Sequence, residues 1–71
     1  MPEAHDLRGL SCPEPTERAR RAILARAPDE LRLLVDDPSA REHLERMGPG
    51  LGYTVEAVRH ARHDEVVLRR V

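Results

Sequence analysis

The feature that most constrains the fold is an apolar strand pattern that gives way, within two residues, to a helix start. Residues 31–35 read LRLLV and alternate in the manner of a half-buried strand. Asp37 then suits a helix N-cap, and Pro38 suits the first helical position, where its missing N–H is not needed. Gly48 followed by Pro49 predicts the end of this helix. The segment therefore predicts a strand that leads directly into a helix.

The remaining chain supplies three further strand patterns and one helix pattern. We expect strands over 4–8, 53–58 and 65–71, and a helix over 13–27. The order strand, helix, strand, helix, strand, strand implies a right-handed crossover between two parallel strands and an antiparallel terminal hairpin. The sequence therefore predicts an α+β fold, a two-layer α/β sandwich of order β-α-β-α-β-β. Its four-stranded mixed sheet has both helices on one face.

Composition limits the core and the classes of function. The 71 residues suffice for one domain, which we expect to span 1–71. There is no Phe or Trp and only one Tyr, so the core must be built from Leu, Val, Ile and Ala, and a deep pocket for a large organic ligand is not expected. Twelve basic and thirteen acidic residues give a net charge of -1, which offers no electrostatic case for nucleic-acid or membrane binding.

The N-terminal residues have neither a cationic start nor an apolar run, so no signal peptide is expected. No stretch approaches the ~20 apolar residues of a membrane span. A single cysteine cannot form an internal disulfide. These features predict a cytoplasmic protein whose thiol stays reduced.

That cysteine stands at the entrance of the first expected helix, in the segment GLSCPEP (9–15). Two cap registers are open: Ser11 as N-cap with Glu14 completing a capping box, or Cys12 itself as N-cap. Both place the sulfur in the first helical turn, where free amides and the helix dipole favour a thiolate. Glu14 opposes this effect and Arg8 supports it, so we expect a modestly lowered pKa for Cys12. The alternative is that Cys12 is a small buried apolar residue.

With these residues the chain resembles the TusA/SirA-like family of sulfur carriers. The hallmark of that family is a Cys-Pro-x-Pro motif that opens the first helix, after a short strand and a glycine. The corresponding residues here are Gly9, Cys12, Pro13 and Pro15. A second hallmark, an Asp-Pro pair between the second strand and the second helix, is matched by residues 37–38. The resemblance covers nearly the whole chain, and the expected element order is that of the family.

The resemblance implies that Cys12 carries sulfur as a persulfide and that Gly9, Pro13, Glu14 and Pro15 position it. The sulfur would come from a donor protein, a cysteine desulfurase or a rhodanese-like protein, and pass to an acceptor sulfurtransferase. A lone thiol suits this role, because a second nearby cysteine would discharge the cargo into a disulfide. We expect no metal and no organic cofactor. Family members serve tRNA thiolation, molybdenum-cofactor sulfuration or sulfur metabolism, and nothing in the sequence selects among these.

Several arginines line the helix that begins at the cysteine: Arg18, Arg20, Arg21 and Arg26. They either dock an acidic patch of a partner or form a solvated face paired with Glu14 and Glu17. We select Arg20 as a partner-binding residue, because the family that the chain resembles tends to be basic there. Asp37 is a second partner-binding candidate, since its loop should lie at the same sheet edge as Cys12, although capping alone explains it.

Two other interpretations stay open. The chain could be a non-catalytic interaction or regulatory module of the same fold with a structural Cys12, or Cys12 could be a redox-sensing thiol. His60 and His63 lie in the expected hairpin connection without a third ligand nearby. We therefore expect polar loop residues there and no metal site.

Overall fold

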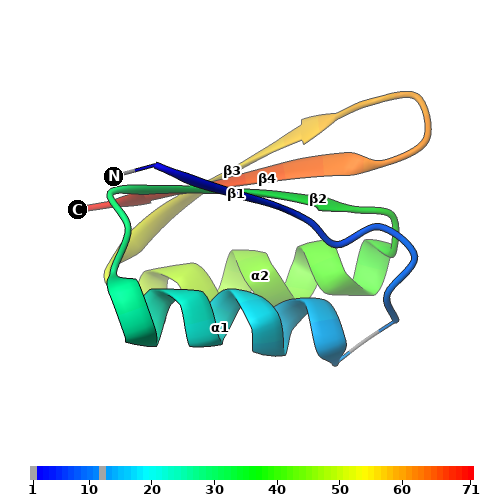
Figure 1. Cartoon of the computed structure of the whole chain (residues 1–71). Coiled ribbons are helices and arrows are strands. Elements are labelled where there is room, and N and C mark those ends of the chain that lie inside the picture. The colour runs from blue at the N-terminus through cyan, green and yellow to red at the C-terminus, as the bar shows by residue number, and fades with distance from the viewer. Residues whose placement is uncertain (1, 12) are drawn as a thin grey trace.

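A computed structural model describes residues 2–11 and 13–71 of the chain. The elements are β1 (Glu3–Asp6), α1 (Glu14–Arg26), β2 (Glu30–Val35), α2 (Pro38–Gly50), β3 (Tyr53–Arg59) and β4 (Asp64–Arg70). The strands form one sheet in the order β1-β2-β4-β3, with β1 and β2 parallel and the other pairs antiparallel. Both helices cover the same face of the sheet (Figure 1). The predicted two-layer sandwich is confirmed.

The core lies between the sheet and the helices. It is formed by Leu7, Ala19, Ala22, Ile23, Leu31, Leu33, Val35, Ala40, Leu44, Tyr53, Val66 and Leu68. The alternation predicted for residues 31–35 is observed, because Leu31, Leu33 and Val35 are buried while Arg32 is exposed. Tyr53, the one aromatic residue, is also buried, and its hydroxyl donates a hydrogen bond of 2.7 Å to the carbonyl of Pro28. Within residues 2–11 and 13–71, no helix has the length and apolar character that crossing a membrane requires.

The start of α2 agrees with the sequence, but its end does not. Asp37 is the N-cap, and its carboxylate accepts a hydrogen bond of 2.9 Å from the Ser39 amide. The predicted stop at Gly48 is wrong, because the helix continues through Pro49 to Gly50. Gly48 instead permits a close approach between α2 and β3, since a Cβ atom there would lie 2.2 Å from Val55 Cγ2.

The start of α1 corrects the expected cap registers. Pro13 is the N-cap, and no side chain caps the helix, so Ser11 and Glu14 do not form a capping box. The Ser11 carbonyl instead accepts a backbone hydrogen bond of 3.0 Å from the Glu14 amide. Pro15, rather than Pro13, occupies the first helical turn, and its ring is buried. The side chain of Cys12 lies outside the described residues.

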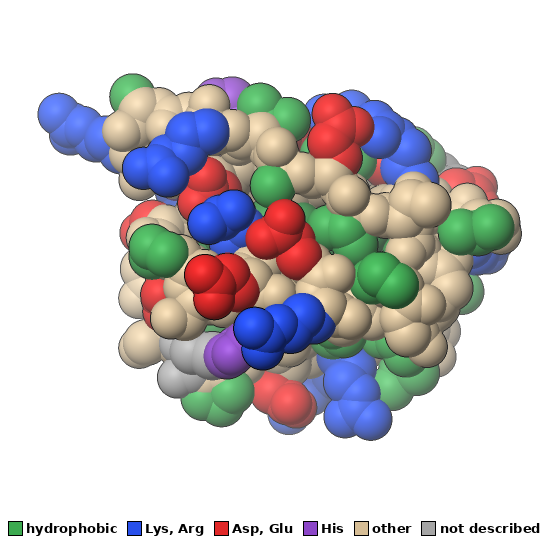
Figure 2. Space-filling model, turned by 180° about the vertical axis from the view of Figure 1, so that it is seen from behind, with side chains coloured by type: hydrophobic (Ala, Val, Ile, Leu, Met, Phe, Trp, Pro, Cys, Tyr) green, Lys and Arg blue, Asp and Glu red, His purple; other side chains and the backbone are tan. Residues whose placement is uncertain are grey.

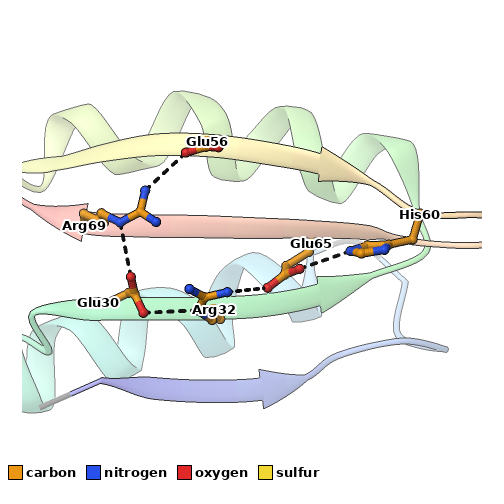
Figure 3. A network of polar contacts seen from close by, with 6 residues as sticks. All are labelled: Glu30, Arg32, Glu56, His60, Glu65 and Arg69. Atoms are coloured by element: carbon orange, nitrogen blue, oxygen red, sulfur yellow. Dashed lines mark hydrogen bonds and ion pairs between the residues drawn. The ribbon is translucent and has the colours of Figure 1, made fainter.

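The sheet face away from the helices carries a network of polar contacts between acidic and basic side chains (Figure 3). In order across the sheet, the members are Glu56, Arg69, Glu30, Arg32, Glu65 and His60. Neighbouring members are joined by side-chain contacts of 3.0 to 3.2 Å. The hydrogen bond from Arg32 lowers the pKa of Glu30, and those from His60 and Arg32 lower the pKa of Glu65. Each carboxylate of this network therefore contacts at least one arginine of the protein.

One ion pair that ties β1 to α1 predicts an acid-sensitive contribution to stability. A hydrogen bond from Arg26, assisted by His5, lowers the pKa of Glu3 from 4.5 to about 2. Because the pKa is lower in the folded state, this contribution is complete above pH 4.5 and is lost as the pH falls toward about 2. In urea unfolding across this range, the wild-type midpoint should fall more steeply than that of Glu3→Gln. Parallel curves for the two proteins would contradict this prediction.

Candidate functional site

The candidate site lies at the end of the sheet where the two parallel strands finish and both helices begin (Figure 1). The connection from Leu7 to Pro13 leaves β1 at this end and contains Cys12 in its sequence. Asp36 and Asp37 join β2 to α2 at the same end, and the β3–β4 connection projects there as well. The expected lowering of the Cys12 pKa falls on a residue outside the described range and stays a prediction.

The connection that contains Cys12 is attached to the neighbouring loop. The Leu7 amide donates a hydrogen bond of 2.8 Å to the Leu34 carbonyl, and the Leu7 side chain is buried. Gly9 follows with a φ of 83°, in the left-handed region that glycine adopts without strain. Its amide faces the carboxylate of Asp36, with nitrogen–oxygen distances of 3.1 Å to Oδ1 and 2.9 Å to Oδ2. Asp36 was not among the predicted site residues.

Arg8 does not offer the free positive charge that the sequence suggested. Its guanidinium donates to both carboxylate oxygens of Asp6, at 2.9 Å from Nε and 2.8 Å from Nη2. These bonds lower the pKa of Asp6 from 3.8 to about 2. The positive charge of Arg8 is therefore largely compensated by its neighbour, and its expected support for a thiolate at Cys12 is reduced.

The other motif residues take different positions around the start of α1. Pro13 and Glu14 are exposed, whereas Pro15 packs into the protein. A hollow opens beside this first turn, and it is lined by Ser11, Pro13, Glu14, Glu17, Arg18 and Arg21. The end of α1 that follows the cysteine thus combines one buried proline with charged side chains that solvent can reach.

Most of the arginines on α1 do not form ion pairs with neighbouring carboxylates. Arg18, Arg20 and Arg21 are exposed, and none of them forms an ion pair with another residue in the described part of the chain. Arg26 differs, because it is bound to Glu3 on β1. The expectation that the arginines pair with Glu14 and Glu17 is therefore not met, and three guanidinium groups face solvent along α1.

Asp37 and the hairpin histidines have clear structural roles. Asp37 caps α2, as described above, and its use as a partner contact stays a prediction. In the β3–β4 connection, the rings of His60 and His63 stack with centroids 4.7 Å apart, and the His60 amide donates to the His63 carbonyl. Among the residues that the structure describes, no group of three or more His, Cys, Asp or Glu side chains is placed to hold a metal ion.

The surface at this end is basic only locally. Viewed from behind, acidic and basic side chains are interspersed over the molecule, and basic side chains project at the end formed by the β3–β4 connection (Figure 2). Arg59 and Arg62 are the arginines of that connection and its flank, and both are exposed. The face that Figure 2 shows therefore has no continuous basic surface of the kind that nucleic-acid binding favours.

Comparison with known proteins agrees with this geometry. The model of the family described as sulfurtransferase TusA matches residues 4–70. Among solved structures, the crystal structure of the SirA-like protein from Desulfitobacterium hafniense is similar with a TM-score of 0.83 and 28% sequence identity, covering 94% of this chain and 95% of that chain. No curated protein matches the chain. Because the family match spans nearly all of the sequence and the fold agrees, the chain belongs to the TusA sulfurtransferase family.

Proposed function

We propose that residues 1–71 form a single cytoplasmic sulfur-carrier domain that accepts a sulfur atom on Cys12 and passes it to an acceptor protein. Membership of the TusA family supports a sulfur-carrier role in general. The observation that carries the assignment to Cys12 is the Cys-Pro-Glu-Pro motif at the start of α1, in a chain with no other cysteine. All thiol chemistry of this chain must therefore pass through that residue.

The proposed reaction is an exchange between sulfur atoms. The Cys12 thiolate attacks the outer sulfur of a donor persulfide, a new S–S bond forms on Cys12, and the donor S–S bond breaks to release the donor thiolate. An acceptor thiolate then attacks the outer sulfur on Cys12, which regenerates the Cys12 thiolate. The partners are a cysteine desulfurase or rhodanese-like donor and an acceptor sulfurtransferase. No electron carrier, metal or organic cofactor is needed, because the sulfur moves at the oxidation level of the donor persulfide.

Sulfur loading tests this proposal directly. The protein is incubated with a cysteine desulfurase and cysteine, or with a rhodanese and thiosulfate, and its intact mass is measured. We expect a single added sulfur atom that a thiol reductant removes. If several donors give no adduct, and Cys12 titrates as an ordinary thiol near pH ~8.5, the carrier proposal is wrong.

Arg18, Arg20 and Arg21 of α1, which form no ion pair among the described residues, also suit a second candidate function, a non-catalytic interaction module. Exposed guanidinium groups recognise carboxylates through paired hydrogen bonds, so an acidic partner surface is the natural complement of α1. Such a module would bind its partner without gaining sulfur. Sulfur loading therefore separates it from a carrier, which must do both.

Charge reversal at Arg20 tests docking apart from chemistry. Arg20→Glu should weaken binding to the donor that loads the protein by roughly fivefold at low ionic strength, and by less at high ionic strength, because salt screens exposed charges. Titration calorimetry at two salt concentrations measures this difference. Arg46→Glu is the matched control, because Arg46 is an exposed arginine on α2 that also lacks an ion pair among the described residues. Equal affinities for Arg20→Glu and wild type would remove Arg20 from the docking surface.

A further inference from the structure

We propose that Asp36 is a positioning residue, which holds the connection that carries Cys12 in place through the backbone amide of Gly9. This role goes beyond the motif residues, and its meaning for sulfur transfer rests on the function proposed above. The hold itself rests only on the geometry of the described residues.

The contact joins two loops that are far apart in the sequence. Asp36 and Gly9 are separated by 27 positions, yet both carboxylate oxygens lie within 3.1 Å of the Gly9 nitrogen. A hydrogen bond to an ionised carboxylate is stronger than one between neutral groups. Gly9 also has a φ of 83°, which a residue with a side chain rarely adopts. The backbone conformation, and not a lack of space, therefore favours glycine at this position, since no atom lies within 4 Å of the place a Cβ would occupy.

Asp36 is well placed to act as a fixed anchor. It follows Val35, the fully buried last residue of β2, and precedes Asp37, the cap of α2. The Asp37 carbonyl accepts hydrogen bonds from the Ala40 and Arg41 amides, and its carboxylate accepts one from Ser39. The backbone on both sides of Asp36 is therefore fixed by β2 and by the start of α2. A carboxylate held in this way can restrict the motion of the Gly9 amide that it binds.

The connection from Leu7 to Pro13 packs Leu7 and Leu10 against the core, but it has few other hydrogen bonds. In the part of it that the structure describes, Asp36 supplies the one side-chain hydrogen bond from a residue beyond β1. On one side, the Leu7 amide binds the Leu34 carbonyl; on the other, the Glu14 amide binds the Ser11 carbonyl as α1 begins. Removal of the Asp36 carboxylate would leave the stretch between these points without its link to the β2–α2 loop. A nucleophile on a loosened connection loses the alignment that rapid attack requires.

The charge of Asp36 and its hold on Gly9 should have opposite effects on the pKa of the Cys12 thiol. A neighbouring carboxylate raises a thiol pKa, so loss of the charge alone should lower the pKa of Cys12. Loss of the hold should raise it toward the ordinary value of about 8.5, because a mobile thiol gains less from the amides that begin α1. The direction of the change therefore distinguishes positioning from simple electrostatics.

The experiment uses the full chain with Asp36→Ala, Asp36→Asn and, as a control, Glu42→Gln. Asparagine at position 36 removes the charge but keeps an oxygen that can accept from Gly9, whereas Glu42 is an exposed carboxylate on α2. Three quantities are measured: hydrogen exchange of the Gly9 amide, the pH midpoint of Cys12 alkylation by iodoacetamide, and the rate of sulfur uptake from inorganic polysulfide.

For Asp36→Ala we expect faster exchange at Gly9 with unchanged protection in β2 and β4, a higher alkylation midpoint, and sulfur uptake slowed roughly tenfold. Asp36→Asn should restore most of the protection and uptake without raising the midpoint, and Glu42→Gln should match wild type. A midpoint of Asp36→Ala no higher than that of Asp36→Asn, or unchanged exchange at Gly9, would overturn the proposal.

Two further design points keep the result decisive. If Asp36→Ala does not fold, Asp36→Glu displaces the carboxylate by one methylene group, and it should raise both the exchange rate and the midpoint by smaller amounts; no change in this variant would overturn the proposal equally. The exchange and alkylation measurements do not depend on sulfur. If wild type fails to load sulfur while these two measurements respond as expected, the proposed function fails and the positioning of Cys12 by Asp36 stands.

Discussion

Cys12→Ser protein is expected to gain no sulfur from any donor that loads the wild type. The chain contains one cysteine, so the variant retains no thiol on which a persulfide can form. A serine hydroxyl is not ionised at neutral pH, and it cannot form the S–S bond on which the transfer depends. Intact mass after incubation with donor, compared between the two proteins, measures the effect, which should be complete rather than partial.

The same variant also separates chemistry from docking. Donor affinity of Cys12→Ser should stay close to that of wild type, because the exposed arginines of α1 are unchanged. Circular dichroism provides the control that the variant is folded. A sulfur adduct on Cys12→Ser would show that another group accepts the cargo. Loss of donor binding in the folded variant would show that Cys12 itself contributes to the interface.

Gly48→Ala is expected to destabilise the protein by about 1–3 kcal/mol, the cost of overpacking a well-filled core. In most helical positions the same change stabilises, since glycine costs about 1 kcal/mol relative to alanine. The sign is reversed here because the new Cβ would lie 2.2 Å from Val55 Cγ2 and 3.4 Å from Leu68 Cδ2. For a domain of this size, such a loss is a large part of the total free energy of unfolding.

A double-mutant cycle identifies the clash. Val55→Ala removes the methyl group that the new Cβ would meet, so the pair Gly48→Ala with Val55→Ala should be more stable than the sum of the two single changes predicts. Gly50→Ala is the matched control, because nothing lies within 4 Å of a Cβ at the last residue of α2. Urea unfolding of the four proteins and the control gives these energies. A stabilised Gly48→Ala protein, or additive effects in the cycle, would contradict the structure.

Gly48 also illustrates which features of the fold could be predicted from the sequence and which could not. The strand at 31–35 and the cap at Asp37 are local features, because side-chain alternation and a carboxylate before a proline act within a few residues. They were predicted correctly, and the order of the elements followed from them. Gly48 followed by Pro49 has the local signature of a helix end, but it serves a contact with Val55 on another element. A tertiary approach of this kind leaves no local pattern.

The candidate site divides in a similar way. Cys12 and its prolines form a compact motif that sequence alone could single out, with the family resemblance giving it meaning. Asp36 was not predicted as a site residue. The sequence explains its neighbour Asp37 as a helix cap, and no local pattern indicates a separate role for Asp36. Its contact with Gly9 exists only once β1 and β2 have paired side by side. The bond between Arg8 and Asp6 likewise depends on side-chain geometry, which decides whether a nearby charge is free or already compensated.

The polar network across the open face of the sheet affects where a partner protein can bind. A partner that covered this face would have to strip water from several ionic groups and offer equivalent contacts in return, which is costly for charges that already satisfy one another. This face is therefore an unfavourable binding surface. The helical side and the end of the molecule where α1 and α2 begin are the more favourable surfaces for a partner protein. Under the function proposed above, such one-sidedness would favour transfer, because each encounter with a donor or an acceptor would be biased toward an orientation in which sulfur can be exchanged.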